Sequence, residues 1–307
     1  MNSIPAQYEP AATPRLLDQV RGKIRLKHYS LRTEQTYVDW IKRFIRHFGK
    51  RHPRELGAAE VEAFLTHLAV VGRVAASTQN QAKSALLFLY REVLDAALPW
   101  LDNVQQAKAP KRLPVVLTRD EVHAVLSRLS GLHWLIASLL YGSGMRLMEC
   151  LRLRVKDIDF ARGEILVRDG KGFKDRVTML PAAVAVALRE QMSRVQALHK
   201  CDLAAGGGEV SLPYALARKY PGAGREWGWQ FVFPSEVLST DPRDGCVRRH
   251  HLQDQAVQRA MKQVVRDAGI VKPATPHTLR HYSEFRTMPS PSNCATEVAR
   301  FASACPA

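Results

Sequence analysis

A short, cationic stretch with two prolines divides this chain and limits what it can fold into. Residues 107–114 read Ala-Lys-Ala-Pro-Lys-Arg-Leu-Pro and show no apolar period. Proline lacks a backbone N–H and has a fixed φ, so neither a helix nor a central strand continues through it. We therefore predict a basic linker at 105–114 between a domain at 15–104 and a domain at 115–281. The linker is either a solvated tether or lies along phosphates, and the charge of the chain favours the second.

The first domain has the periodicity of a small helical bundle. Residues 15–48 are expected to be helical, because apolar side chains recur at helical spacing from Tyr37 to Phe48. A second stripe runs from Val61 to Leu68. Ser77 is a candidate N-cap for a third helix that reaches about Leu94.

The second domain mixes helices with a small antiparallel β element. Thr118 and Glu121 have the spacing of a capping box, which predicts the start of a helix. Alternating apolar residues flank a glycine-containing turn at 170–174, which predicts a β-hairpin. Further helices are predicted through about Tyr141, from Arg146 to Leu153, from Pro181 to His199 and from about His251 to Ala268. The fold class is therefore mainly α with a small β element, a helical bundle being followed by an α+β domain.

The charge of the chain predicts a polyanionic partner. Its 307 residues contain 45 Lys and Arg against 29 Asp and Glu, a formal net charge of +16. Nucleic acid and an anionic membrane surface both fit such a charge. No apolar run approaches the roughly 18 residues of a spanning helix, and residues 1–14 contain no apolar signal core. We expect a cytoplasmic nucleic-acid-binding protein without a membrane partner.

No cofactor or metal is expected. The five cysteines are widely spaced and form no Cys-x-x-Cys pair, so neither a zinc nor a disulfide framework is indicated. The glycines around Lys171 lack the spacing of a phosphate loop, and those at 142 and 144 lack the third glycine of a dinucleotide fingerprint. Cys246 and His250–His251 do not have a usual zinc spacing. A basic segment that faces DNA explains residues 248–250 better.

Four residues form a candidate functional set. Arg146 follows a Gly-Ser-Gly-Met turn, and Lys171 lies at the hairpin tip. His277 and Arg280 are one helical turn apart on one face. Each has an ordinary explanation by itself: Arg146 can pair with Glu149, Lys171 can be solvated, and His277 can cap a helix.

Together these residues resemble the ordered signatures of tyrosine recombinases, the phage-integrase family of DNA strand-exchange enzymes. The three motifs are Tyr-Gly-Ser-Gly-Met-Arg-Leu-Met-Glu at 141–149, Gly-Lys-Gly-Phe-Lys-Asp-Arg at 170–176 and His-Thr-Leu-Arg-His at 277–281. Segments at 28–37, 113–118 and 272–277, and an insertion at 212–233, are similar to those of integron integrases. The resemblance covers roughly residues 15–281.

The resemblance implies a SAM-like core-binding domain, a catalytic domain and a metal-independent reaction. In that reaction a tyrosine hydroxyl attacks a DNA phosphodiester and forms a 3′-phosphotyrosine. Arg146 and Arg280 would stabilise the charge on the non-bridging oxygens. His277 would assist by hydrogen bonding or proton transfer, and Lys171 would protonate the departing 5′ oxygen. Further DNA contacts are expected from the cationic residues Lys108, Lys111, Arg112, Lys174, Arg248, Arg249 and His250.

The same resemblance implies the partners. Integron integrases recombine gene-cassette sites, which are double-stranded or folded single-stranded DNA. Family members assemble as tetramers on DNA, commonly through exchange of a C-terminal helix.

The family pattern stops after His281. Family members continue with an apolar helix, a Leu-Gly-His-like segment and then the nucleophilic tyrosine. Here Pro289 and Pro291 interrupt any helix in the 282–307 tail, and no tyrosine follows Tyr282. Tyr282 is a poor substitute, because it lies on the expected helix of the phosphate site and lacks a mobile helix of its own. We expect a truncated or frameshifted catalytic domain that binds DNA without cleaving it and assembles weakly.

Two other functions remain open. The chain can be a non-enzymatic DNA-binding remnant that occupies recombination sites or inhibits an intact recombinase. It can also be a generic basic regulator unrelated to recombination, although the ordered Arg, Lys and His-x-x-Arg motifs argue against this.

A frameshift has a direct consequence for the coding DNA. If the tail results from one, another reading frame downstream of codon 281 encodes an apolar helix and a tyrosine in the family pattern. Resequencing the coding DNA checks this. A region with no such frame would contradict the hypothesis.

Overall fold

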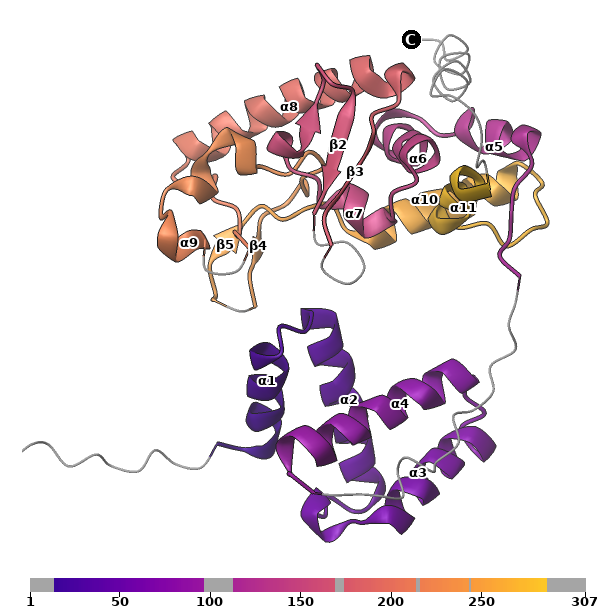
Figure 1. Ribbon diagram of the computed structural model, residues 1–307, viewed down its shortest axis with the longest axis vertical. Helices are drawn as coiled ribbons and strands as arrows, with labels where there is room; N and C mark the ends of the chain where they lie inside the picture. Colours follow the sequence, from indigo (N-terminus) through magenta and orange to yellow (C-terminus); the bar gives the residue numbers. More distant parts are fainter. Residues whose placement is uncertain (1–13, 97–112, 169–173, 214–215, 243, 286–307) are drawn as a thin grey trace, which may run out of the picture. The chain divides into compact units, whose positions relative to one another are not determined.

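The computed structural model describes residues 14–96, 113–168, 174–213, 216–242 and 244–285, with the backbone alone for 281–285. The chain separates into two units, Met1–Arg112 and Leu113–Ala307 (Figure 1). Each unit has an apolar core of its own. Most of the expected linker lies outside the described residues.

Four α-helices lie in the described residues of the first unit, 14–96. They are α1 (Leu16–Leu26), α2 (Leu31–His47), α3 (Ala58–Val70) and α4 (Ala76–Phe88), and α4 continues into a π-helical turn at Leu89–Val93. A 3-10 turn at Pro53–Glu55 leads from α2 towards α3. The apolar stripe of α2 faces inward, since Ile41 and Phe44 are fully buried. The helical bundle expected from the periodicity is thereby confirmed.

Two local expectations for this unit are wrong. Residues 15–48 do not form one helix, because His28 has a φ of 55° and interrupts it. Ser30 then starts α2, its Oγ accepting a hydrogen bond from the Thr33 N–H at 3.1 Å. Ser77 is not an N-cap either, since α4 begins one residue earlier with Ala75 as its cap.

The second unit combines helices with two small antiparallel sheets. Helices α5 (Arg119–Leu126), α6 (Gly131–Ser143) and α7 (Leu147–Leu151) come first. Strands β1 (Ile158–Asp159), β2 (Glu164–Val167) and β3 (Arg176–Met179) form one sheet in that order, with Val167 opposite Arg176. The remaining elements are α8 (Ala185–Ala204), α9 (Leu216–Lys219), β4 (Ser239–Thr240), β5 (Val247–Arg248), α10 (Asp254–Asp267) and α11 (Pro276–Phe285).

Several predictions for the second unit are confirmed. Thr118 and Glu121 form the capping box of α5, with hydrogen bonds of 3.2 and 2.7 Å. The hairpin is strands β2 and β3, although its tip at 169–173 lies outside the described residues. The predicted helix from about His251 begins three residues later, at Asp254. The chain is mainly α with a small antiparallel β element, as expected.

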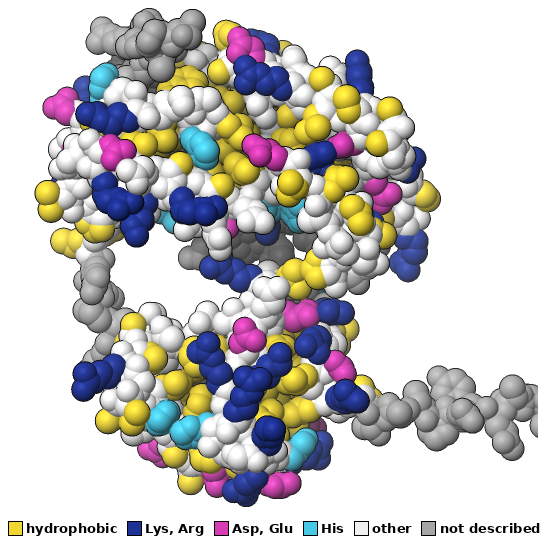
Figure 2. Space-filling view, turned by 180° about the vertical axis from the view of Figure 1, so that it is seen from behind, with side chains coloured by type: hydrophobic (Ala, Val, Ile, Leu, Met, Phe, Trp, Pro, Cys, Tyr) yellow, Lys and Arg dark blue, Asp and Glu magenta, His cyan; other side chains and the backbone are white. Residues whose placement is uncertain are grey.

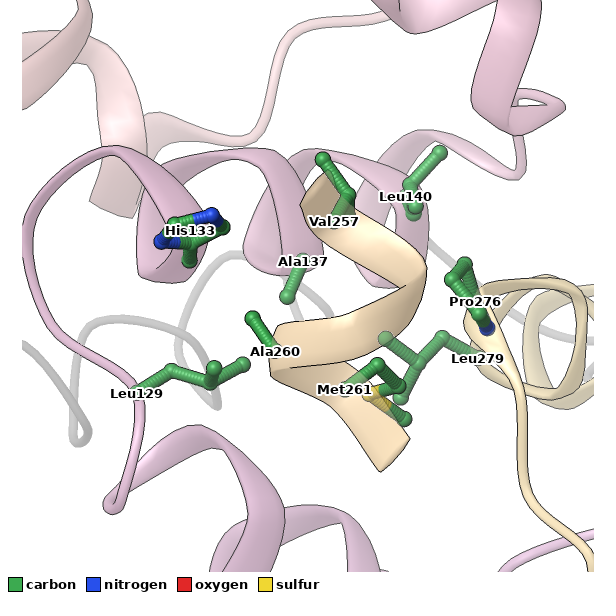
Figure 3. Close-up of a pocket in the computed structure, with 9 residues that line it drawn as sticks. All are labelled: Leu129, His133, Ala137, Leu140, Val257, Ala260, Met261, Pro276 and Leu279. Atoms are coloured by element: carbon green, nitrogen blue, oxygen red, sulfur yellow. The ribbon is translucent and has the colours of Figure 1, made fainter. Parts of the chain in front are cut away.

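Helix α11 is seated on α6 and α10 by apolar side chains. Leu279 of α11 is fully buried, and Met261 of α10 is 2% exposed. Figure 3 shows both beside a shallow apolar pocket, which is completed by Leu129, His133, Ala137, Leu140, Val257, Ala260 and Pro276. This packing leaves His277 exposed on the same helix, one position after the buried Pro276.

Tyr90 offers a test of the first core. Its side chain is 2% exposed, and its hydroxyl lies 3.1 and 2.9 Å from the carbonyl oxygens of Pro53 and Leu56. Tyr90→Phe is expected to lower the free energy of unfolding of this unit by about 1–2 kcal/mol, because buried carbonyls lose their donor. Urea denaturation measures the change, with Tyr29→Phe at a 40% exposed position as the control. Equal stabilities of the two variants would contradict the role of the hydroxyl.

Candidate functional site

The turn between α6 and α7 presents Arg146. Helix α6 ends at Gly144, whose φ of 66° is the left-handed conformation that glycine adopts without strain. Met145 is fully buried and anchors the turn, and Arg146 follows as the N-cap of α7 with its side chain 31% exposed. Gly142 packs so closely on Pro181 that an added Cβ would lie 2.4 Å from the proline Cγ. Gly142 therefore serves close packing, and Gly144 serves the turn.

Arg280 reaches the same turn from the other end of the unit. Its Nε donates a hydrogen bond of 2.8 Å to the carbonyl oxygen of Gly144, two residues before Arg146. His277 lies one turn earlier on α11. The structure thus attaches the helix that carries His277 and Arg280 to the turn that presents Arg146.

Glu149, which the sequence suggests only as an ordinary ion-pair partner of Arg146, is central to this site. Glu149 accepts hydrogen bonds from the Arg146 backbone N–H at 2.8 Å and from Arg146 Nη1 at 2.7 Å. It also accepts a pair from Arg176, at 3.1 Å from Nη1 and 2.6 Å from Nη2. The ion pair leaves Arg146 with further donors, since a guanidinium has five N–H groups.

The charge of Glu149 is maintained by these arginines. Its side chain is only 8% exposed. Burial alone would raise the pKa of the carboxyl, but hydrogen bonds from Arg176 and Arg146 outweigh burial and lower the pKa from 4.5 to about 2. Glu149 is therefore ionised at neutral pH and holds two cations in fixed positions.

Arg176 is a site residue that sequence reasoning missed. It stands at the start of β3, two residues after the exposed Lys174. A second contact fixes the same strand, because Thr178 Oγ1 donates a hydrogen bond of 2.7 Å to the Ser143 carbonyl oxygen. Arg176 closes the motif at 170–176, but a sequence gives no sign of which carboxylate such an arginine meets. Lys171, the hairpin-tip candidate, lies outside the described residues.

The basic residues of the 248–250 segment are occupied by internal contacts. Arg248 pairs with Glu209 at 3.2 Å and with Asp244, and its side chain is 14% exposed. Arg249 makes two hydrogen bonds to Asp202, of 2.6 and 2.8 Å, and is 12% exposed. These carboxylates pair with both guanidinium groups, so the geometry offers no support for their predicted contact with DNA.

Of the other residues predicted to contact DNA, the structure describes the side chains of His250 and Lys174. His250 stacks on Phe231 with ring centroids 5.5 Å apart, and burial and the charge of Arg152 lower its pKa, which disfavours a cationic imidazole. Lys174 is exposed. Outside the described residues lie Lys108, Lys111, Arg112 and the side chain of Tyr282. Their contacts with DNA, and that of Lys174, stay predictions.

The insertion segment is anchored by cation–aromatic contacts. The Arg154 guanidinium lies 4.5 Å from the centre of the Phe231 ring and 5.4 Å from that of Trp229. Arg154 Nη1 also donates a hydrogen bond of 2.6 Å to the Trp229 carbonyl oxygen. Lys156 also contacts Trp229, with its Nζ 2.8 Å from the centre of the ring. These contacts hold the end of the insertion against the segment that follows α7.

The described part of the chain contains neither a metal-binding cluster nor a membrane-spanning helix. There, no group of three or more His, Cys, Asp or Glu residues has an arrangement that could hold a metal ion. In the same ranges, no helix has both the length and the apolar character needed to cross a membrane. Figure 2 shows Lys and Arg side chains spread over the visible face of each unit, with Asp and Glu between them.

Both halves of the chain match family models. Residues 16–100 match the N-terminal SAM-like domain of phage integrases, and residues 116–287 match the phage integrase family. Proteins called Integrase/recombinase from Escherichia coli and from Pseudomonas aeruginosa are each 55% identical over 281 residues, which is 92% of this chain and 83% of theirs. The putative integrase/recombinase y4qK of Sinorhizobium fredii is 27% identical over 276 residues, 90% of this chain and 76% of its own.

Solved structures show the same fold. A lambda integrase tetramer bound to a Holliday junction has a TM-score of 0.56 at 18% identity, covering 93% of this chain and 76% of that one. XerH recombinase in a post-cleavage complex with its difH substrate has a TM-score of 0.52 at 20% identity, covering 87% and 72%. The expected SAM-like first domain and α+β second domain are confirmed.

Glu149→Gln tests the charge network. The pKa of Glu149 is lowered in the folded state, so its contribution to stability is present above about pH 4.5 and is lost as the pH falls towards 2. We expect the substitution to lower the free energy of unfolding of the second unit by about 3 kcal/mol at neutral pH. The difference from the wild type should shrink on acidification, in urea denaturation measured at several pH values.

Glu190→Gln is the matched control, because Glu190 is exposed on α8. This control should stay within about 0.5 kcal/mol of the wild type. A Glu149→Gln effect that does not change between neutral and acid pH would contradict the proposed role of the charge.

Proposed function

The chain belongs to the phage integrase family of tyrosine recombinases, and from this membership we propose that it is an integron-type recombinase chain. The reaction of that type is the integration and excision of gene cassettes through breaking and rejoining of DNA. The DNA partner is double-stranded or folded single-stranded DNA at recombination sites. The motifs at 28–37, 113–118 and 272–277 and the insertion at 212–233 support the integron type.

The observation that carries the proposal is the convergence of two arginines on one turn. Arg280 is hydrogen-bonded to Gly144, and Arg146 is held by Glu149 just beyond it. Two guanidinium groups fixed in this way suit the non-bridging oxygens of a phosphodiester, where charge grows in the transition state. His277, exposed on α11, would hydrogen-bond or transfer a proton at the same phosphate. Lys171 would protonate the leaving 5′ oxygen.

The proposed domain organisation has four parts. A core-binding domain at 15–104 and a catalytic domain at 115–281 flank the basic linker at 105–114, and the tail at 282–307 departs from the family pattern. Lys174 and the linker cations Lys108, Lys111 and Arg112 would contact phosphates. Arg248 and Arg249 are assigned a structural role instead, because carboxylates hold both.

A polypeptide of these 307 residues would bind DNA without cleaving it. No tyrosine follows Tyr282 within these 307 residues, so a polypeptide limited to them would supply no nucleophile of the family kind. Because the sequence at 282–307 departs from the family pattern, this polypeptide would assemble into tetramers more weakly. Such a chain occupies recombination sites and, mixed with an intact relative, would inhibit it.

A suicide DNA substrate separates binding from cleavage. We expect the 307-residue chain to shift cassette-site DNA in a mobility assay and to form no covalent protein–DNA adduct, because the nucleophile is missing. An intact integron integrase serves as the positive control for the adduct. A robust adduct would overturn the non-cleaving assignment, and a shift without preference for cassette sites would favour a generic DNA-binding protein.

Arg280→Gln tests the phosphate site itself. Removing one charge-assisted contact should weaken DNA binding about tenfold and make it less dependent on salt concentration. Fluorescence anisotropy over a salt series measures both. Arg194→Gln, which removes an equal charge from the exposed face of α8, is the control and should change affinity much less. Equal losses for the two variants would show that only total charge matters.

A further inference from the structure

Lys272 makes contacts that the phosphate site does not explain. Its Nζ lies 2.7 Å from Glu121 Oε2 and 3.3 Å from the carbonyl oxygen of Val116. The two partners lie 151 and 156 residues earlier in the chain. Lys272 therefore ties the beginning of the second unit to the segment between α10 and α11.

The Glu121 end of this contact is well defined. The same oxygen, Oε2, accepts a hydrogen bond of 2.7 Å from the Thr118 N–H, as part of the capping box of α5. Leu117, which follows Val116 directly, is 1% exposed and belongs to the core. The ammonium group thus meets a carboxylate and a carbonyl that the core and the helix cap already hold in place. Hydrogen bonding from Lys272 also lowers the pKa of Glu121, which keeps the carboxylate charged.

The segment that follows Lys272 connects it to helix α11 of the phosphate site. Ala274 is 8% exposed, and its N–H donates a hydrogen bond of 2.7 Å to the Lys272 carbonyl oxygen. The Thr275 N–H donates to Thr278 Oγ1 at 3.0 Å, and Thr278 N–H donates to the Thr275 carbonyl oxygen at 2.8 Å. Pro276 then begins α11 with φ already set for a helix. Hydrogen bonds therefore hold the backbone between Lys272 and His277.

We propose that Lys272 is a positioning residue, whose contacts with Glu121 and Val116 fix helix α11, and with it His277 and Arg280, to the start of the second unit. Its effect on DNA rests on the proposed function, since it requires that His277 and Arg280 bind phosphate. The anchoring of α11 does not depend on that function. The Lys272 side chain is 41% exposed, so the alternative is an ordinary surface ion pair with little effect.

Hydrogen exchange of the full chain without DNA tests the anchoring. Lys272→Met removes the ammonium but keeps the apolar stem, and should speed exchange of the α11 amides roughly twofold to fivefold. Lys272→Arg keeps the charge and should restore most of the protection. Lys262→Met removes an equal charge from the exposed face of α10 and should leave α11 unchanged. Exchange in α8 reports whether a variant is generally destabilised. Identical α11 exchange in Lys272→Met and Lys262→Met overturns the proposal.

A double-mutant cycle on DNA affinity tests positioning of the phosphate site. If Lys272 acts through α11, Arg280→Gln should cost at least threefold less affinity in the Lys272→Met background than in the wild type. Additive losses would overturn the effect on the site, because they are what two independent cations produce. If the wild type binds no DNA, the proposed function fails, and the exchange measurement still decides whether Lys272 anchors α11.

Discussion

The site depends on one buried carboxylate. Glu149 receives hydrogen bonds from Arg146 and Arg176, which stand on different elements, and these bonds keep it ionised despite its burial. A buried charge without partners would be costly, so the three groups stabilise one another only when α7 and β3 are both in place. The orientation of Arg146 is consequently a property of the folded unit.

Helix α11 is held in a similar way, by apolar packing supplemented with a few polar contacts. Leu279 is buried against α6 and α10, while Arg280 bonds to Gly144. Lys272 contributes a further contact just before the helix begins. Groups that are arranged before a ligand arrives need little rearrangement when negative charge develops between them.

Sequence patterns that span a few residues predicted most helices and strands. They failed where the sequence carries no clear mark of a helix end. The capping box at Thr118 and the hairpin of β2 and β3 were predicted because their hydrogen bonds join residues close in sequence. The break between α1 and α2 was missed, since the apolar stripe used for the prediction begins only at Tyr37 and His28 carries no sign of a left-handed conformation. The sequence gives no sign that Arg248 pairs with Glu209 and Arg249 with Asp202, because these carboxylates lie 39 and 47 residues away; Asp244, a further partner of Arg248, lies four residues before it.

The sequence by itself determined the two-part organisation, the helical and β segments and the order of Arg146, Lys171, His277 and Arg280. The tertiary structure decided which of these groups meet. Arg280 bonds to Gly144 across 136 residues, Arg176 to Glu149 across 27, and Lys272 to Glu121 across 151. Backbone propensity and capping act within about one helical turn, whereas such contacts require the cores to pack first and bring distant segments together.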